Sequence, residues 1–192
     1  MRINTFKTLV VKTRTVRRLY QAHRVKRADL LELVNLARLS ASGGNLQPLK
    51  YILSCDPKRN AMIFTCLAWA GYLKTWGGPV EGERPAAYII ILGDTTIRRE
   101  FGCDHGIAAQ SIMLGATAKG LGGCIIGSIK RERLRAGQAI PVKYEILLVL
   151  ALGRPVEKVI LEAVQDGDIK YWRDAKGRHH VPKRSLREIV LA

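Results

Sequence analysis

The length of the apolar runs is what most constrains the fold of this chain. The two longest are AAYIIILG at residues 86–93 and YEILLVLALG at residues 144–153. Both have the length of buried strands, and both are far shorter than the about 20 residues that a membrane-spanning helix needs. Residues 1–18 also lack the continuous apolar core and cleavage site of a signal peptide. We therefore expect a cytoplasmic protein that does not associate with a membrane.

Strands and helices are expected to alternate along the chain. The pattern predicts strands at 49–55, 86–94, 123–129 and 143–155, and helices at 28–40, 57–73, 103–122 and 130–140. The strands are too few, and the segments between them too unequal, for a doubly wound parallel sheet. The prediction is an α+β sandwich in which helices surround a small mixed or antiparallel sheet. With 192 residues, 47% of them hydrophobic, the whole chain 1–192 is expected to form one domain.

The cysteines and histidines do not indicate a metal site. The four cysteines, at positions 55, 66, 103 and 124, form no Cys-x-x-Cys pair and lie among apolar neighbours. Only the histidines at 179 and 180 are adjacent, and no carboxylate or thiol is spaced to complete a site with them. We expect buried thiols in a reducing compartment, and no bound metal.

The charge is large and uneven. The formal net charge is +16, and residues 1–28 hold nine Lys or Arg and no carboxylate. Residues 170–187 add seven more basic side chains against a single Asp. Basic segments of this kind can bind a polyanion or a phosphorylated small molecule, or they can simply form solvated surface. A nucleic-acid-binding module is the alternative from another class, but the chain has no interleaved stacking aromatics and no known nucleic-acid-binding signature.

A polar, glycine-containing loop separates two elements that are expected to be buried. It reads SASGGNLQP, at residues 40–48. Its residues are ordinary turn formers, so a plain turn explains it. They also supply short hydrogen-bonding groups and allow close backbone approach, so a bound ligand explains it as well.

Four separated segments give this loop a context. RTVRR at 14–18 precedes the first predicted helix, GLGGCIIGS at 120–128 follows a helix that begins Asp-x-Gly-x-Ala, and LALGRP (150–155) and VPKRSL (181–186) come near the end. In this order, and over roughly residues 10–190, the chain resembles the nitroreductase family of FMN-dependent oxidoreductases. The resemblance implies a homodimer with FMN at the subunit interface.

The resemblance also implies which basic residues hold the FMN phosphate. Arg14, Thr15 and Arg17 match the phosphate-binding segment, with Thr15 in place of the more usual Ser. Lys183 and Arg184 match a basic contact near the C-terminus of family members. Guanidinium and hydroxyl groups form strong hydrogen bonds to phosphate. Because Arg17 lies in a polar N-terminal segment, we expect it to contribute little to the core.

Other matched positions surround the flavin ring. Ser42, Gly43, Asn45 and Gln47 match the loop that lines the FMN of the partner chain. Ile126 and Gly127 match a segment whose backbone N–H groups face the pyrimidine side and N5 of the ring; many family members have Glu or Gly in place of Ile126. These six positions complete the predicted cofactor site.

The function implied by the resemblance is ping-pong reduction of an electron-poor acceptor. NAD(P)H would reduce FMN and leave, and a nitroaromatic or quinone would then bind in place of the nicotinamide. No general acid or nucleophile stands out, and none is needed, because the flavin carries the chemistry. Specialised non-reductase flavoproteins of the same fold remain an alternative. The aromatic residues between 69 and 76 are compatible with a substrate pocket, with the core and with a dimer interface.

Overall fold

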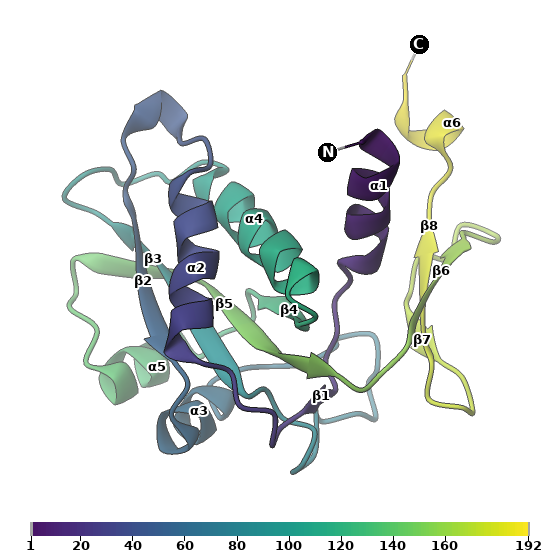
Figure 1. The fold of residues 1–192 in the computed structure, drawn as a ribbon, viewed down its shortest axis with the longest axis horizontal. Helices are drawn as coiled ribbons and strands as arrows, with labels where there is room; N and C mark the ends of the chain where they lie inside the picture. Colours follow the sequence, from purple (N-terminus) through teal and green to yellow (C-terminus); the bar gives the residue numbers. More distant parts are fainter. Residues whose placement is uncertain (1, 192) are drawn as a thin grey trace.

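The computed structural model describes residues 2–191, and its centre is an antiparallel sheet of five strands (Figure 1). The long strand β5 pairs with β3 on one side and with β4 and β1 on the other, and β2 lies beyond β3. The bounds are β1 Leu19–Tyr20, β2 Leu49–Ser54, β3 Ala87–Asp94, β4 Gly122–Ile126 and β5 Tyr144–Pro155. The two longest apolar runs of the sequence are thus β3 and β5, at the middle of the sheet.

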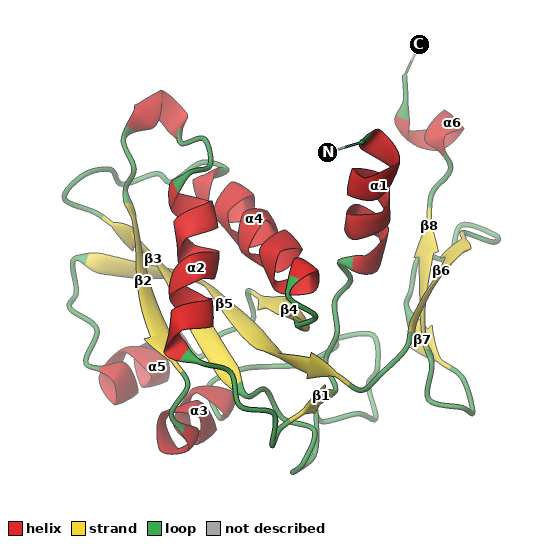
Figure 2. Ribbon diagram, viewed as in Figure 1, coloured by secondary structure: helices red, strands yellow, loops and turns green. Residues whose placement is uncertain are grey.

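Helices cover both faces of this sheet (Figure 2). The helices α2 and α4 pack on one face, and α3 and α5 on the other. The bounds are α1 Ile3–Lys12, α2 Arg27–Arg38, α3 Pro57–Phe64, α4 Asp104–Ala118, α5 Arg131–Gln138 and α6 Leu186–Ile189. The predicted α+β fold, with helices around a small sheet, is confirmed.

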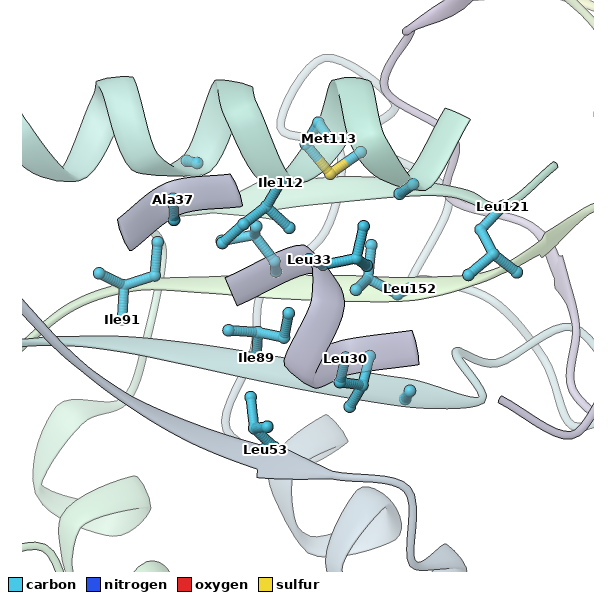
Figure 3. Close-up of a cluster of buried hydrophobic side chains, with 14 of the residues drawn as sticks. Leu30, Leu33, Ala37, Leu53, Ile89, Ile91, Ile112, Met113, Leu121 and Leu152 are labelled. Atoms are coloured by element: carbon cyan, nitrogen blue, oxygen red, sulfur yellow. The ribbon is translucent and has the colours of Figure 1, made fainter. Parts of the chain in front are cut away.

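The core on the first face joins α2 and α4 to the sheet (Figure 3). Leu33 of α2 and Ile112 of α4 are fully buried there, together with Ile89 and Ile91 of β3. The two helices approach closely because α4 has a glycine at the contact: a Cβ on Gly115 would lie 2.3 Å from a methyl carbon of Leu36. A larger side chain at this position would therefore push the helices apart.

The second face explains why β3 reads as an unbroken apolar run. Tyr88 and Ile90, which alternate with Ile89 and Ile91, point toward α3 and α5 and are also buried. A strand covered on both faces has no need of polar residues at alternate positions.

One predicted helix is too long. We expected a helix over 57–73, but α3 ends at Phe64. The chain after it is held against the segment that follows β4: Leu67 forms a bridge with Ile129, and the Ala68 N–H donates to the Ser128 carbonyl at 3.0 Å. Tertiary pairing thus replaces the last turns of helix that the apolar pattern favours.

A second, three-stranded sheet near the C-terminus was not predicted. It consists of β6 Val159–Ala163, β7 Trp172–Arg173 and β8 His179–Lys183, with β8 in the middle, parallel to β6 and antiparallel to β7. Figure 1 shows it to one side of the main sheet. The helix α1 was also not predicted, and none of its residues is buried. No helix in the described part of the chain is long and apolar enough to cross a membrane.

Candidate functional site

The RTVRR segment runs along the open edge of β4. Thr15 forms a parallel bridge with Gly123, and the Val16 N–H donates to the Gly123 carbonyl at 2.7 Å. The structure therefore brings Arg14 and Thr15 beside the GCIIGS segment, over one hundred residues away in sequence.

The alternation of backbone groups along β4 decides which residues offer hydrogen bonds at this edge. Because the Gly123 carbonyl faces the RTVRR segment, the backbone groups of Ile125 face the same open side, whereas those of Ile126 face β5. The Ile126 side chain is buried, while Ile125 is 38% exposed. Gly127 directly follows β4, and a Cβ there would meet nothing closer than 3.9 Å.

A small cavity lies between this edge and α4. Its volume is ≈ 150 Å³, and its lining includes Arg14, Thr15, Gln110, Met113 and Ile125. The Arg14 guanidinium donates from Nη2 to the Val10 carbonyl at 2.9 Å, but its Nε is buried and has no partner among residues 2–191. Burial also lowers the pKa of Arg14. An unpaired cationic donor of this kind fits an anionic group such as a phosphate.

Arg17 does not face this cavity. The residue is 9% exposed, its Nη1 donates to His179 Nε2 at 3.1 Å, and its guanidinium lies 4.6 Å from the centre of the Tyr171 ring. The expectation that Arg17 contributes little to the core is therefore wrong. It packs between the main sheet and the C-terminal sheet, where its backbone N–H also donates to the Glu157 carboxylate. Its role at the phosphate remains a prediction.

Two adjacent histidines of β8 have opposite environments. Burial, followed by the charge of Arg17, lowers the pKa of His179 to about 4. The pKa of His180 is raised by its hydrogen bond to Glu162, at 2.9 Å, and by Asp174, at 3.3 Å. His179 is thus a neutral acceptor for Arg17, and His180 favours its charged form.

We expect NMR titration to separate these two rings. An unfolded imidazole titrates near pH 6.5, so the His179 contribution to stability is lost as the pH falls from that value toward about 4. The His180 contribution is complete below about pH 6.5 and is lost as the pH rises through its higher folded pKa. Two rings that titrate together at the unfolded value would contradict this arrangement.

The SASGGNLQP loop is held by Asp104, a residue that was not among the predicted site residues. The carboxylate of Asp104, at the start of α4, accepts from Ser42 Oγ at 2.6 Å and from the Gly43 N–H at 2.9 Å. Ser42 Oγ in turn accepts from the Gln47 N–H at 3.0 Å. Ser42 and Gly43 therefore anchor the loop to the start of α4 through their hydrogen bonds with Asp104.

The tip of the loop has an unusual backbone. Gly44, Asn45 and Gln47 have φ angles of 58°, 54° and 51°. The left-handed region is costly for residues other than glycine, so the surrounding hydrogen bonds must hold this conformation. The Gln47 side-chain amide donates to the Asn45 carbonyl and to Asn45 Oδ1, each at 3.2 Å. The result is a preorganised polar tip that faces solvent in this chain.

Replacing Asp104 with alanine should release this tip. The substitution leaves Ser42 Oγ and the Gly43 N–H without their acceptor, which costs about 1–3 kcal/mol. Burial alone would raise the pKa of Asp104, but hydrogen bonds from Ser42 and Gly43 lower it. The contribution of these hydrogen bonds to stability should therefore be complete above an ordinary Asp pKa of about 3.9 and be lost only at lower pH.

Hydrogen exchange would measure this release. We expect amide protection in residues 42–47 to fall in the Asp104→Ala variant. Asp168→Ala, which removes an exposed carboxylate from a surface turn, is the control. Unchanged protection in both variants would mean that the loop does not depend on Asp104.

Lys183 and Arg184 lie at the end of β8. Lys183 is paired with Ala163 in the C-terminal sheet, and Arg184 forms an exposed ion pair with Glu188 at 3.3 Å. Neither residue lines the cavity beside Arg14. Of the eleven predicted positions, the structure thus brings together Arg14 and Thr15 with the segment at 123–127, and it groups the four loop residues separately.

The polar loop and the cavity beside Arg14 contact different turns of α4. Asp104 holds the loop at the first residue of this helix, and Gln110 and Met113 line the Arg14 cavity six and nine residues later. At 1.5 Å per residue this separates them by about 9–14 Å along the helix axis. Sequence reasoning missed Asp104, Gln110 and Ile125; strand alternation in GCIIGS was the one available signal, for Ile125.

Comparison with known proteins agrees with the fold. A sequence model of the nitroreductase family matches residues 10–154 of this chain. The match ends at β5, so it does not reach the C-terminal sheet or Lys183 and Arg184, although the motifs had suggested a resemblance over nearly the whole chain.

Solved structures of similar architecture share little sequence with this chain. An FMN-dependent nitroreductase from Clostridium difficile R20291 is 22% identical, with a TM-score of 0.65 over 83% of this chain and 92% of that one. A nitroreductase family protein from Streptococcus pneumoniae TIGR4 is 16% identical, with a TM-score of 0.69 over 83% and 95%. A Parabacteroides distasonis ATCC 8503 protein, provisionally named an NADH dehydrogenase/NAD(P)H nitroreductase, is 20% identical, with a TM-score of 0.67 over 86% and 94%.

Proposed function

This chain belongs to the nitroreductase family, and from that premise we propose that it is an FMN-dependent oxidoreductase that takes its electrons from NAD(P)H. The observation that carries the proposal is the unpaired, buried Nε of Arg14 beside the open edge of β4. A phosphate in the cavity would accept from Arg14 and from the hydroxyl of Thr15. The backbone N–H groups of Ile125 and Gly127 would then be available to the ring.

The chain itself contributes binding and orientation. When bound, FMN supplies the redox chemistry, accepting a hydride from NAD(P)H and reducing an electron-poor acceptor such as a nitroaromatic or quinone in ping-pong fashion. The residues of this chain fix the phosphate and offer backbone donors at the edge of the ring. Arg17, Lys183 and Arg184 remain proposed phosphate contacts. The ring contact expected at Ile126 is proposed for its neighbours Ile125 and Gly127, because the backbone groups of Ile126 face β5.

We also propose that the active form is a homodimer. In one chain the polar loop lies about 9–14 Å along α4 from the Arg14 cavity, and in the proposed dimer a second copy would bring its Asn45 and Gln47 against the flavin. Exposed leucines on and after α2 support this: Leu31, Leu39 and Leu46 are 51%, 66% and 47% exposed. The proposal also includes a cytoplasmic location and a single FMN-binding domain over residues 1–192. The four cysteines are free thiols.

Reconstitution with FMN tests the proposal. We expect the purified protein to retain bound, yellow flavin after gel filtration and to elute as a dimer at micromolar concentration. Stopped-flow mixing with NADH and with NADPH should bleach the flavin absorption with at least one donor. Protein that stays colourless would refute FMN binding. Bound flavin that neither donor reduces would refute the reductase activity and leave a specialised flavoprotein of the same fold.

A further inference from the structure

A larger cavity lies on the other side of the molecule from α2 and α4. Its volume is ≈ 520 Å³, and it is lined by α3, the segment 81–86, residues 21–22 and the start of β3. It shares no lining residue with the cavity beside Arg14 or with the one beside the polar loop. Much of its wall is apolar, made by Pro57, Ala61, Phe64 and Pro85.

Two buried donors without partners border this cavity. The Tyr88 side chain is 1% exposed and its hydroxyl has no hydrogen-bond partner in the described chain. Burial raises the pKa of Tyr88, so the phenol stays protonated and remains a donor. Arg84 Nε is also buried and finds no partner in the part of the chain that the structure describes, while the Arg84 guanidinium lies 4.6 Å from the centre of the Phe64 ring. Unpaired buried donors are uncommon, and two at one cavity indicate a missing acceptor.

The wall that carries Arg84 is braced before any ligand binds. The Leu19 N–H donates to the Glu83 carbonyl at 2.9 Å, and the Gly82 N–H donates to Gln21 Oε1 at 2.8 Å. Arg18 Nε also donates to Glu83 Oε2 at 2.7 Å. These contacts hold the segment against the end of β1, so the cavity is preformed and binding would require little ordering.

The charges at the cavity favour an anion. Arg84 is the one cationic side chain in its lining, and Glu81 the one carboxylate. Glu81 is 80% exposed and reaches Arg84 Nη1 only at 3.5 Å. An exposed pair of this kind contributes little, so a ligand carboxylate would replace it at small cost.

We propose that this cavity binds a small aromatic monocarboxylate. The carboxylate accepts from the Arg84 guanidinium and from the Tyr88 hydroxyl, and the ring packs between Phe64 and the prolines. The cavity is many times the volume of one water molecule, about 30 Å³, and its apolar wall gives waters few partners. The site is independent of the proposed flavin site.

Calorimetric titration of the purified, FMN-treated protein with benzoate tests this assignment. We expect saturable binding of one benzoate per chain, in the weak range usual for so small a ligand. Benzamide, which is similar in shape but neutral, should bind at least tenfold more weakly. Arg84→Gln should weaken benzoate binding about ten- to a hundredfold, whereas Arg133→Gln, an equal charge loss at an exposed position of α5, should not change it.

Tyr88→Phe separates binding from folding. This change removes only the unpaired hydroxyl, so the melting temperature should stay the same or rise, while benzoate binding weakens several-fold. A lower melting temperature with unchanged binding would show that the hydroxyl is structural and would overturn the assignment. Equal benzoate affinity for wild type and Arg84→Gln would also overturn the assignment. If benzoate then also changed the flavin absorption, it would be assigned to the flavin site instead.

Discussion

Arg14→Ala is expected to weaken FMN binding about ten- to a hundredfold, because a charge-assisted hydrogen bond contributes about 1.5–3 kcal/mol. Among the predicted phosphate residues, Arg14 both lines the cavity and has a buried donor without a partner. Its removal should leave the fold intact, since its hydrogen bond in this chain is made to the carbonyl of Val10 at the end of an exposed helix. Titration of FMN, followed by quenching of flavin fluorescence, measures the effect.

The control for Arg14 is a second arginine of the same basic segment. Arg24 is exposed and lies outside the cavity, so Arg24→Ala removes the same charge without removing a proposed contact. Both variants should be titrated at the same ionic strength, because surface charge attracts any anion at low salt. Equal FMN affinities for the two variants would mean that Arg14 acts only through net charge.

Glu157→Ala should have the largest effect on stability, about 3–5 kcal/mol. The Glu157 side chain is fully buried between the two sheets. Its carboxylate accepts from the backbone N–H groups of Arg17 and Arg18 and from Arg173 Nη2, at 2.9 Å in the last case. Removing it leaves a buried guanidinium and two N–H groups without their acceptor. The melting temperature should fall by roughly 6–20 °C, as about 2–4 °C per kcal/mol is usual for a chain of this length.

The same substitution should affect the C-terminal sheet first. We expect amides of β6 and β8 to lose protection against hydrogen exchange before those of β3 and β5, because Glu157 connects the sheets. Glu100→Ala, which removes an exposed loop carboxylate, should leave the melting temperature within about 2 °C, in keeping with the small effect of most surface substitutions. A similarly small change for Glu157→Ala would show that the carboxylate does not hold the sheets together.

The fold was predictable where burial leaves a pattern in the sequence. The runs at β3 and β5 read as strands because both faces of the sheet are covered. The C-terminal sheet was missed because β7 has two residues and β6 and β8 have five each, with charged side chains among them. The end of α3 was missed because it is set by pairing with residues 128–129, which no local pattern records.

The candidate site was predictable as a set of segments but not residue by residue. Arg14 and Arg17 are the same type of residue, and only the path of the chain directs one to the cavity and the other into a buried contact with His179. Ile125 and Ile126 are chemically identical, and their difference rests on which strand edge is open. Asp104 reads as an ordinary first-turn acid of a helix, and its hydrogen bonds to the loop depend on tertiary packing.

The central position of β5 also bears on how the chain acquires its structure during synthesis. Strands β1, β3 and β4 all pair with β5, which spans residues 144–155, whereas β2 and β3 pair with each other. As the chain leaves the ribosome, only the β2–β3 pair can form before β5 emerges. Leu19 and Tyr20 must therefore wait for partners about 135 positions later in the chain. Such distant pairing slows folding, and the apolar run of β3 stays half-covered meanwhile, at the stage when nascent chains are prone to aggregate.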